Sequence, residues 1–399
     1  MKTIVKRVMK IPMLLLYHLF ILVNRVDTSI ILFESNLGRN YSGNPRFIYE
    51  ELVRRGLDRS YRCYFILEDT SVSLPGSAGK VKRISMLYFY LFAKAGTWVS
   101  DTRMPAYLKK RKGTIYIQTW HGTPLKKLGL DLEQVSMAGE KGLEDYKRKF
   151  ALNSKTWDYL LSQNAYSTRI FRRAFAFDKE ILEIGYPRND ILFHENDPGS
   201  IVDIKRKLGL PVDKKLLLYA PTWRDNEHYG HLTYRFSSGI DYDYLQEKLS
   251  RDYVIIIKAH YLVGEKLDLE KYRGFLYQFG ASSDIAELYL VSDMLITDYS
   301  SVMFDYSLLR RPMLFYTYDL EQYKDSLRGF YFDFMEEAPG PIVITSEQLV
   351  KAIEEYDFCE YQEKYDAFRE KYNHADHGDA AKQVVDLICQ RPGGKLPPS

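Results

Sequence analysis

The chain has 399 residues, which is enough for two domains of ordinary size rather than one large core. Hydrophobic residues make up 46% of it and charged residues 27%, as in ordinary globular proteins, and its net charge of +3 is too small and too dispersed to favour a nucleic-acid-binding protein. Its three cysteines, Cys63, Cys359 and Cys389, cannot all pair and lack metal-ligand spacing, so they are typical of reduced thiols and not of a disulfide scaffold.

Residues 1–26 differ from the rest of the chain. One side of the predicted helix is basic and carries Lys2, Lys6, Arg7 and Lys10. The opposite side is apolar and leads into the apolar stretch 11–23, which is shorter than the roughly 20 residues of a membrane span. We expect a basic amphipathic helix on the anionic, cytoplasmic surface of a membrane. A buried core helix and a secretory signal are the alternatives, although no small-residue cleavage site precedes Asp27.

From 27 to 192 the pattern alternates between strands and helices, which predicts a parallel sheet covered by helices on both faces. Strands are expected at 29–33, 61–67, 97–100, 114–119 and 156–159, and helices at 47–55, 84–94 and 166–175. Ligands bind beyond the carboxyl ends of such strands. The loop 34–46 leaves the first strand, so Gly38 and Asn44 become candidate ligand contacts, with a plain surface turn as the alternative.

The strand at 114–119 is followed by the string W-H-G-T-P-L-K-K-L-G. The pattern predicts His121 at a strand tip, Gly122 where the backbone approaches a neighbour closely, and Thr123 as the cap of a helix that begins at Pro124. An imidazole beside a helix N-terminus has a chemical use, while a purely structural histidine is the alternative.

A second alternating series occupies 193–399, after a polar linker at 193–205. Strands are expected at 216–219, 253–257, 294–296 and 313–315, with a helix at 283–290. The strand ends carry hydrogen-bond donors and cations: Thr222, Arg224, Lys258, His260, Ser300 and Ser301. We therefore predict an α/β protein of two Rossmann-like, doubly wound halves that face each other across a cleft.

The stretch M-L-I-T-D-Y-S-S-V-M-F-D-Y at 294–306 is typical of a strand, a tight turn and a helix. Ser300 or Ser301 would be the N-cap, and neither has Glu or Gln three residues on, so the reciprocal capping box is missing. The spare hydroxyls would suit an anion, and an ordinary serine-capped helix is the alternative. Asp298 has no carboxylate partner at D-x-D spacing, so we expect it to orient Ser300 or a cation rather than bind a metal.

Several common site motifs are absent. The chain has no G-x-G-x-x-G, no P-loop and no H-E-x-x-H motif, which argues against a simple dehydrogenase, a kinase and a zinc enzyme. The donors and cations at the strand ends suit a diphosphate that is cleaved without a metal, because protein charge can stabilise the leaving group. We expect neither a metal nor a cofactor.

Six motifs in order carry a family resemblance. They are F-E-S-N-L-G-R-N-Y-S-G-N-P-R (33–46), Q-T-W-H-G-T-P-L-K-K-L-G (118–129), Y-A-P-T-W-R-D (219–225), K-A-H (258–260), I-T-D-Y-S-S-V-M-F-D-Y (296–306) and R-G-F-Y-F-D (328–333). Together they resemble the CDP-glycerol glycerophosphotransferase family of wall teichoic acid synthesis. The resemblance covers most of the chain, from 33 to about 387.

The resemblance implies a GT-B fold at the cytoplasmic face of the membrane. It implies transfer of glycerol phosphate, or of ribitol phosphate in relatives, from a CDP-alditol to a lipid-linked acceptor with release of CMP. The paired histidines of the family fall on His121 and His260, and its donor-diphosphate contacts fall on Arg224, Ser300 and Ser301. Arg328, at the start of the last motif, is a further candidate substrate contact. His121 is the expected base; His260 either holds the diphosphate or protonates the departing CMP.

Two departures from the family pattern affect these expectations. The family usually has D-G before its last helix, where this chain reads His377-Gly378-Asp379. The chain also lacks the extra N-terminal region of the long polymerases, so we expect a primase that adds the first unit to an undecaprenyl-diphosphate disaccharide.

The alternatives are a poly(glycerol or ribitol phosphate) polymerase, a capsule alditol-phosphate transferase, a GT-B nucleotide-sugar enzyme and an inactive membrane scaffold. Assembly into a homo-oligomer or a wall-synthesis complex stays open.

Overall fold

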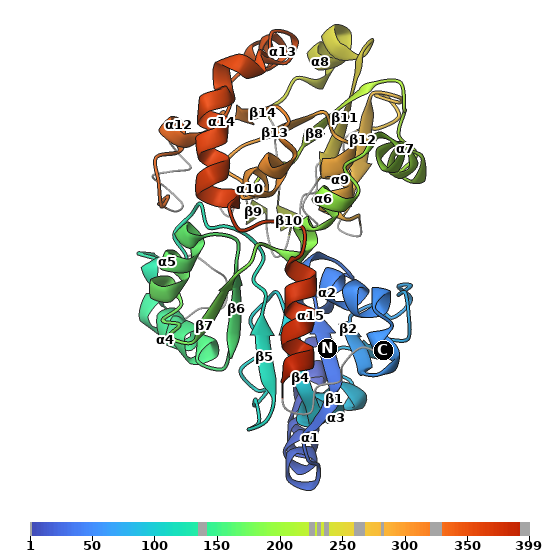
Figure 1. The fold of residues 1–399 in the computed structure, drawn as a ribbon, viewed down its shortest axis with the longest axis vertical. Coiled ribbons are helices and arrows are strands. Elements are labelled where there is room, and N and C mark those ends of the chain that lie inside the picture. Colours follow the sequence, from blue (N-terminus) through green and yellow to red (C-terminus); the bar gives the residue numbers. More distant parts are fainter. Residues whose placement is uncertain are drawn as a thin grey trace.

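The computed structural model consists of two α/β domains that lie end to end along the long axis of the molecule (Figure 1). It describes residues 2–134, 142–222, 228–229, 233–234, 239–258, 268–280, 283–319 and 329–391, with the backbone alone at 2–11, 228–229 and 233–234. Each domain is built on its own parallel sheet, as the alternating sequence pattern predicts.

The first domain contains a seven-stranded parallel sheet in the order β3-β2-β1-β4-β5-β6-β7. The strands are β1 (Asp27–Glu34), β2 (Arg62–Leu67), β3 (Gly79–Lys82), β4 (Ala95–Ser100), β5 (Ile115–Gln118), β6 (Tyr159–Ser162) and β7 (Glu180–Glu183). Its helices are α1 (Lys2–Val23), α2 (Gly43–Arg54), α3 (Met86–Lys94), α4 (Leu143–Ser154) and α5 (Ala165–Ala174), with short 3-10 turns at Asn36–Gly38, Leu57–Arg59, Gly129–Asp131 and Pro187–Asn189.

The second domain contains a six-stranded parallel sheet in the order β12-β11-β8-β13-β14-β15. The strands are β8 (Lys215–Tyr219), β11 (Tyr253–Lys258), β12 (Leu276–Phe279), β13 (Met294–Thr297), β14 (Met313–Tyr316) and β15 (Ile342–Val343), and β9 (His228–Tyr229) pairs with β10 (Thr233–Tyr234) outside it. The helices of this half of the sequence are α6 (Ile191–His194), α7 (Pro198–Lys207), α8 (Tyr242–Leu249), α9 (Ile285–Val291), α10 (Val302–Tyr306), α12 (Phe334–Glu337), α13 (Ser346–Glu354), α14 (Phe358–Asn373) and α15 (Ala380–Gln390).

The last helix does not stay in the second domain. Figure 1 shows that α15, in red, runs down beside the sheet of the first domain. Its apolar residues Val384, Val385 and Ile388 belong to the buried cluster that contains β1, β2 and α2. The carboxylate of Asp190 accepts hydrogen bonds from the first backbone N–H groups of α15, at 3.1 and 2.8 Å. The unit predicted as 193–399 therefore ends in a helix that packs on the first domain.

The helix predicted to begin at Pro124 is not formed. Residues 124–128 instead run beside the segment at 329–331 of the second domain, where Lys127 N donates to Gly329 O at 2.9 Å and Tyr331 N donates to Leu125 O at 2.9 Å. Thr123 is buried, and its hydroxyl donates to Gln163 Oε1 at 2.7 Å instead of capping a helix. Tertiary pairing thus outweighs the local helix-start signal at Thr123 and Pro124.

Helix α1 is part of the first domain and has two different faces. Tyr17 is fully buried and its hydroxyl bonds to the backbone of Lys109, while Phe20 packs edge-on against Tyr90 of α3. The other face leaves Leu19 and Leu22 exposed. None of the described helices is long and apolar enough to cross a membrane.

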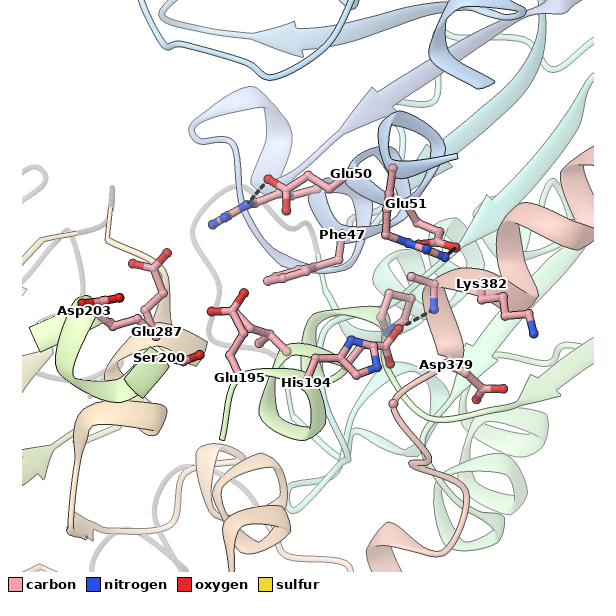
Figure 2. Close-up of a pocket in the computed structure, with 18 of the residues that line it drawn as sticks. Phe47, Glu50, Glu51, His194, Glu195, Ser200, Asp203, Glu287, Asp379 and Lys382 are labelled. Carbon is pink, nitrogen blue, oxygen red and sulfur yellow. Dashed lines mark hydrogen bonds and ion pairs between the residues drawn. The ribbon is translucent and has the colours of Figure 1, made fainter. Parts of the chain in front are cut away.

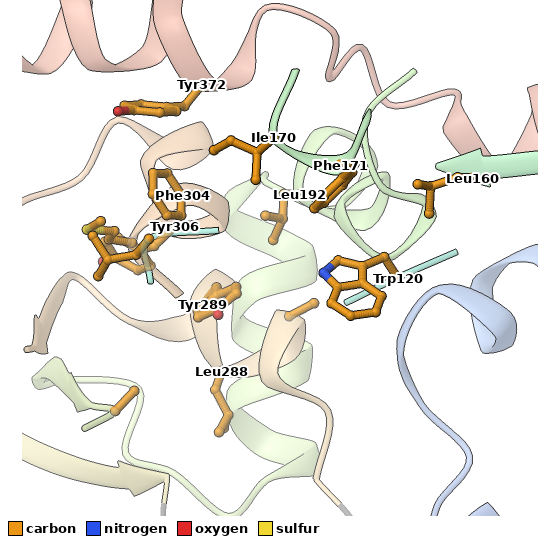
Figure 3. Close-up of a cluster of buried hydrophobic side chains, with 14 of the residues drawn as sticks. Trp120, Leu160, Ile170, Phe171, Leu192, Leu288, Tyr289, Phe304, Tyr306 and Tyr372 are labelled. Atoms are coloured by element: carbon orange, nitrogen blue, oxygen red, sulfur yellow. The ribbon is translucent and has the colours of Figure 1, made fainter. Parts of the chain in front are cut away.

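The domain junction is itself a hydrophobic core. Figure 3 shows Trp120 and Phe171 of the first domain in one buried cluster with Tyr289 and Phe304 of the second, and Leu192 of the connecting helix α6 lies between them. Close packing of this kind resists sliding, because shifted side chains would leave voids. The core therefore holds the two sheet edges in a defined relation.

Candidate active site

A cavity of about 1080 Å³ lies between the two domains, at the carboxyl ends of their parallel strands. It is lined by predicted site residues from both sides: His121, Gly122 and Thr123 from the first domain, and Thr222, Lys258, Ser300 and Ser301 from the second. The expected cleft is therefore present, and it brings most of the candidate residues together.

Three candidates lie elsewhere. Gly38 has φ of +79° in a tight turn, and a side chain there would meet Arg83, so the residue serves the turn. Asn44 is buried; its amide donates to the carbonyls of Thr119 and Trp120 at 3.2 and 3.1 Å, so it holds the backbone just before His121. Neither residue lines the cavity.

Asp298 is the third candidate that lies outside the cavity lining. It is buried behind Thr222, whose N–H and hydroxyl donate to its carboxylate at 2.9 and 2.6 Å. Among the described residues, the hydrogen-bond partner of Asp298 is therefore Thr222 and not Ser300, and the alternative that Asp298 orients a cation stays a prediction. Arg224, His260 and Arg328 lie outside the described residues.

His121 is fixed by the strand ends of the first domain. Its Nδ1 lies 2.8 Å from the backbone oxygen of Asp101, which follows β4, and its ring stacks on Trp120 with centroids 4.4 Å apart. Trp120 has φ of +52°, a left-handed conformation that costs energy in a residue other than glycine. Strain of this kind persists where surrounding contacts impose it, and here it turns the imidazole into the cavity.

The protonation state of His121 suits a base. A carbonyl oxygen only accepts, so Nδ1 carries the proton and Nε2 keeps its lone pair. The residue is exposed to the cavity, while the Asp101 backbone covers Nδ1 and the Trp120 ring covers one face of the imidazole, which partly desolvates it. This desolvation lowers the pKa of His121, and the charges of Arg188 and Arg103 lower it further, against the opposing hydrogen bond to Asp101. The imidazole is therefore neutral at pH 7.

A buried ion pair connects His121 to the second domain. Arg188 donates to the backbone oxygen of His121 at 2.8 Å and to the carboxylate of Asp305 at 2.6 Å. Asp305 lies on α10 and also accepts from Gln163 and Asn189, at 3.3 and 3.0 Å. The pair is nearly inaccessible to solvent, with exposed side-chain fractions of 12% and 4%. One aspartate thus ties α10 to the backbone that carries the imidazole.

The wall formed by the second domain offers uncommitted hydroxyls. Ser301 is the N-cap of α10 but makes no side-chain capping bond, and Ser300 makes only a long contact of 3.5 Å with Val302 N. Both line the cavity, so their hydroxyls face its interior. The sequence predicted hydroxyls at this turn that are not used for helix capping, and the side chains of Ser300 and Ser301 have this geometry.

Lys258 supplies a cation from the end of β11. Its ammonium donates to the carbonyls of Gly280 and Ser283, at 2.5 and 2.6 Å. Burial lowers the pKa of Lys258 to about 8, against the opposing charge of Asp284. The amine stays mainly protonated at neutral pH and is held at the edge of the cavity.

The two walls come closest at Gly122. A side-chain carbon there would lie 3.2 Å from the hydroxyl oxygen of Ser301 in the opposite domain. Glycine thus permits the close approach of the two walls that the motif predicts at this position. His121 directly precedes Gly122 in the chain, so its backbone lies near the serine turn.

Residues 15–390 match the family model described as CDP-Glycerol:Poly(glycerophosphate) glycerophosphotransferase. The chain belongs to this family. It therefore belongs to the CDP-glycerol glycerophosphotransferases that the motifs resemble.

Relatives support the assignment at the level of sequence. The chain is 43% identical over 376 residues to a teichoic acid poly(glycerol phosphate) polymerase of Bacillus subtilis and 46% identical over 377 residues to one of Staphylococcus epidermidis. These alignments cover 93% and 94% of the chain but 50% and 52% of the relatives, so it spans about half their length. A teichoic acid glycerol-phosphate transferase of Staphylococcus aureus is 41% identical, with 94% of this chain and 96% of that protein covered.

Solved structures agree with the fold. A structure of the wall teichoic acid polymerase TagF superposes with a TM-score of 0.89 at 43% identity, covering 97% of this chain and 94% of that one. A second TagF structure, obtained after a soak with CDPG, has a TM-score of 0.85 at 45% identity and covers 91% and 89%. The two-domain α/β architecture of this family member is therefore shared with TagF.

This family member has a second cavity of about 990 Å³ between α2, α6, α7, α9 and the segment entering α15 (Figure 2). Its lining is rich in carboxylates: Glu50, Glu51, Asp190, Glu195, Asp203, Glu287 and Asp379. Three of the basic side chains there form ion pairs: Arg46 with Glu50, Arg54 with Glu51 and Lys207 with Glu287. Such a surface repels anions, so the first cavity is the better candidate for an anionic ligand.

The sequence motifs missed two contributors to the candidate site of this family member. Arg188 and Asp305 lie 117 positions apart in the chain, and neither stood out by local pattern, although Asp305 is inside the 296–306 motif. A buried arginine pairs with a carboxylate almost always, but its partner is decided by tertiary folding. Within the described residues, no group of three or more His, Cys, Asp or Glu side chains is arranged to hold a metal ion.

Proposed function

We propose that the protein transfers glycerol phosphate from CDP-glycerol to the glycerol phosphate end of a lipid-linked acceptor and repeats this step as a polymerase. The observation that carries the proposal is the neutral imidazole of His121 facing the cavity beside the hydroxyls of Ser300 and Ser301. Polymerase replaces the primase expected from the sequence, because the relatives from Bacillus subtilis and Staphylococcus epidermidis bear that name.

The reaction is a displacement at phosphorus. The acceptor hydroxyl attacks the phosphorus that bears glycerol, the bond from that phosphorus to the oxygen bridging to CMP breaks, and CMP leaves with the electron pair. Nε2 of His121 takes the hydroxyl proton, since its lone pair is free and its pKa keeps it neutral. The ammonium of Lys258 and the Ser300 and Ser301 hydroxyls then stabilise charge on the diphosphate. Arg224 and His260 are proposed to complete this side.

The test is an incubation of the protein with labelled CDP-glycerol and a lipid-linked disaccharide that already carries one glycerol phosphate unit. A polymerase yields a ladder of products and equimolar CMP, and a primase adds one unit to the bare disaccharide and stops. CDP-ribitol and UDP-sugars, offered separately, identify an alditol-phosphate transferase of another specificity or a nucleotide-sugar enzyme. Nucleotide release from UDP-sugars alone would contradict the proposal.

Metal-independent transfer is part of the same proposal. The cations and hydroxyls of the protein take the place of magnesium on the diphosphate. CMP release should therefore keep its rate in excess EDTA after removal of divalent ions. A rate that collapses in EDTA and returns with Mg²⁺ would contradict this part of the proposal and leave the transferase assignment intact.

We also propose that the first domain binds the cytoplasmic surface of an anionic membrane through an apolar patch on α1 and the start of α3. The patch consists of exposed side chains: Leu15, Leu19, Leu22, Val23, Ile84, Met86 and Leu87. Helix α1 packs on α3, so these residues share one end of the domain (Figure 1). An apolar patch of this kind on a surface helix suits partial insertion between headgroups.

Deletion of α1 would be a poor test, since it removes the buried Tyr17 and opens the core. Replacing Leu15, Leu19 and Leu22 together with Glu should instead release the folded protein from phosphatidylglycerol vesicles in a sedimentation assay. The matched control is Leu152→Glu, at an exposed leucine on α4 outside the patch. Unchanged sedimentation of the triple variant would show that the membrane contact lies elsewhere.

A further inference from the structure

The cavity extends past His121 into the first domain, between the loop after β4 and helix α4. This extension is lined by Arg103, Met104, Ala106, Tyr146, Lys149 and Phe150. The guanidinium of Arg103 lies over two aromatic rings, 4.4 Å from the centroid of Phe150 and 5.4 Å from that of Tyr146. The extension thus has a cation on an aromatic platform, and both belong to the first domain.

Arg103 differs from Arg188, the other arginine that lines this cavity among the described residues. Arg188 pairs with Asp305 at 2.6 Å. Arg103 is half-buried, yet it makes no ion pair or hydrogen bond with any described residue. Its aromatic contacts hold the guanidinium and leave its N–H groups unused by the described part of the protein. A fixed guanidinium with free donors matches the two oxygens of a phosphate group.

Arg103 lines the same cavity as His121, the proposed base for the acceptor hydroxyl. Its charge is close enough to His121 to contribute to the lowered pKa of that imidazole. An anion held by Arg103 would therefore share the cavity with the base that receives the acceptor proton. The serine turn and Lys258, by contrast, belong to the wall formed by the second domain. The two walls of the cavity can thus each bind an anionic group.

We propose that Arg103, on its platform of Tyr146 and Phe150, binds the phosphodiester that precedes the attacking hydroxyl of the acceptor. This proposal rests on the proposed function and defines its acceptor. A glycerol phosphate end has a phosphodiester a few bonds from its terminal hydroxyl, whereas in a bare lipid-linked disaccharide two sugars separate the accepting end from the diphosphate. The site therefore selects an acceptor that already carries glycerol phosphate. Neutralisation of Arg103 by this group also raises the proton affinity of His121 when the acceptor is bound.

The kinetic test compares Arg103→Gln with wild type on the disaccharide carrying one glycerol phosphate unit. Hydrogen bonds to charged groups contribute about 1.5–3 kcal/mol, so KM for this acceptor should rise roughly 10- to 100-fold, with KM for CDP-glycerol unchanged. Arg103→Lys keeps the positive charge but lacks the paired N–H donors of the guanidinium, so it should recover part of the lost acceptor affinity. The matched control is Arg148→Gln on α4, an exposed residue that pairs with Asp145 outside the cavity and should have no effect.

Three outcomes would overturn the proposal. They are an unchanged KM for the acceptor, an equal rise in KM for CDP-glycerol, and an equal effect on the bare disaccharide. A direct measurement separates this inference from the proposed function, because it needs no turnover. A soluble glycerol phosphate trimer, titrated into the protein by calorimetry, should bind wild type at least tenfold more tightly than Arg103→Gln. Equal binding by the two proteins, or equally tight binding of inorganic phosphate to wild type, would contradict a phosphodiester site even if the enzyme proves to be a transferase.

Discussion

The two walls of the cleft are built in different ways. The wall of the first domain holds His121 through the Asp101 carbonyl, the Trp120 ring and the Arg188 guanidinium, so the imidazole has one position and one tautomer. The wall of the second domain presents Ser300 and Ser301, whose hydroxyls make only one long hydrogen bond, of 3.5 Å, within the described residues. The group proposed to move a proton is thus preorganised, while the groups proposed to meet a ligand are left uncommitted.

The largest effect is expected on the preorganised wall. Replacing His121 with Ala removes the base, so turnover should fall by about two to four orders of magnitude while CDP-glycerol still binds. Single-turnover CMP release and equilibrium dialysis with CDP-glycerol measure the two quantities. His374→Ala, at an exposed histidine paired with Glu183, is the control and should be active. Near-normal turnover of a folded His121 variant would show that His121 is not the base, and that the preorganised wall does not carry the proton transfer.

The second prediction concerns the ion pair that joins the walls. Asp305→Asn leaves the buried guanidinium of Arg188 without its counter-charge, so the free energy of unfolding should fall by about 3–5 kcal/mol. Denaturant unfolding measures the change. Asp366→Asn breaks the exposed pair with Arg310 and should cost less than about 1 kcal/mol. Similar losses in the two variants would mean that burial adds little to the Arg188 pair.

A smaller effect is expected from the uncommitted wall. Ser301→Ala removes a hydroxyl that makes no capping bond to α10 and no hydrogen bond to another described residue, so stability should be unchanged. The loss of one hydrogen bond to a charged diphosphate should raise KM for CDP-glycerol by about tenfold. Ser301→Thr retains the hydroxyl and should restore most of the affinity. A marked drop in the melting temperature of Ser301→Ala would show that this hydroxyl is structural after all.

The smallest effect comes from a buried carboxyl behind His121. Burial raises the pKa of Asp101 to about 7, although Asn36 N–H donates to its carboxylate. The folded protein therefore favours the protonated carboxyl. The stability that this preference supplies is fully present below the unfolded pKa of about 4 and is lost as pH rises through 7, where the buried carboxyl must ionise. Asp101→Asn should raise Tm relative to wild type by about 2–4 °C at pH 8, with little difference at pH 4. A Tm difference independent of pH, measured by scanning calorimetry, would contradict this.

Local patterns were sufficient for much of the fold. The strands around residues 31, 64, 217, 256 and 295 are short apolar runs between turn signals, and each lies in a parallel sheet as predicted. The short strands β3 and β7 and the polar helix α4 were missed. Val81 is the one buried residue in β3, so its burial pattern is too weak to read. For α4, a polar sequence conceals a buried edge formed by Tyr146 and Phe150.

Part of the candidate site was also predictable. His121, Gly122, Ser300 and Ser301 follow strand ends, and strand ends of parallel sheets converge on one edge. Asn44 and Asp298 have the right residue types near that edge, but their hydrogen bonds are consumed within the protein. Sequence patterns can predict which polar groups lie near a site, but they do not predict which of these groups are already hydrogen-bonded within the protein.

The amino-acid sequence by itself determined the two alternating halves, the cleft between them and the family, because periodicity and short motifs are local properties of the chain. The tertiary structure decided which groups are paired and which are free. It placed α15 back on the first domain, paired residues 124–128 with a segment from the second domain, joined Arg188 to Asp305 and left Arg103 on its aromatic platform. These features depend on contacts between residues far apart in the chain, where burial of apolar surface and pairing of buried charges outweigh local preference.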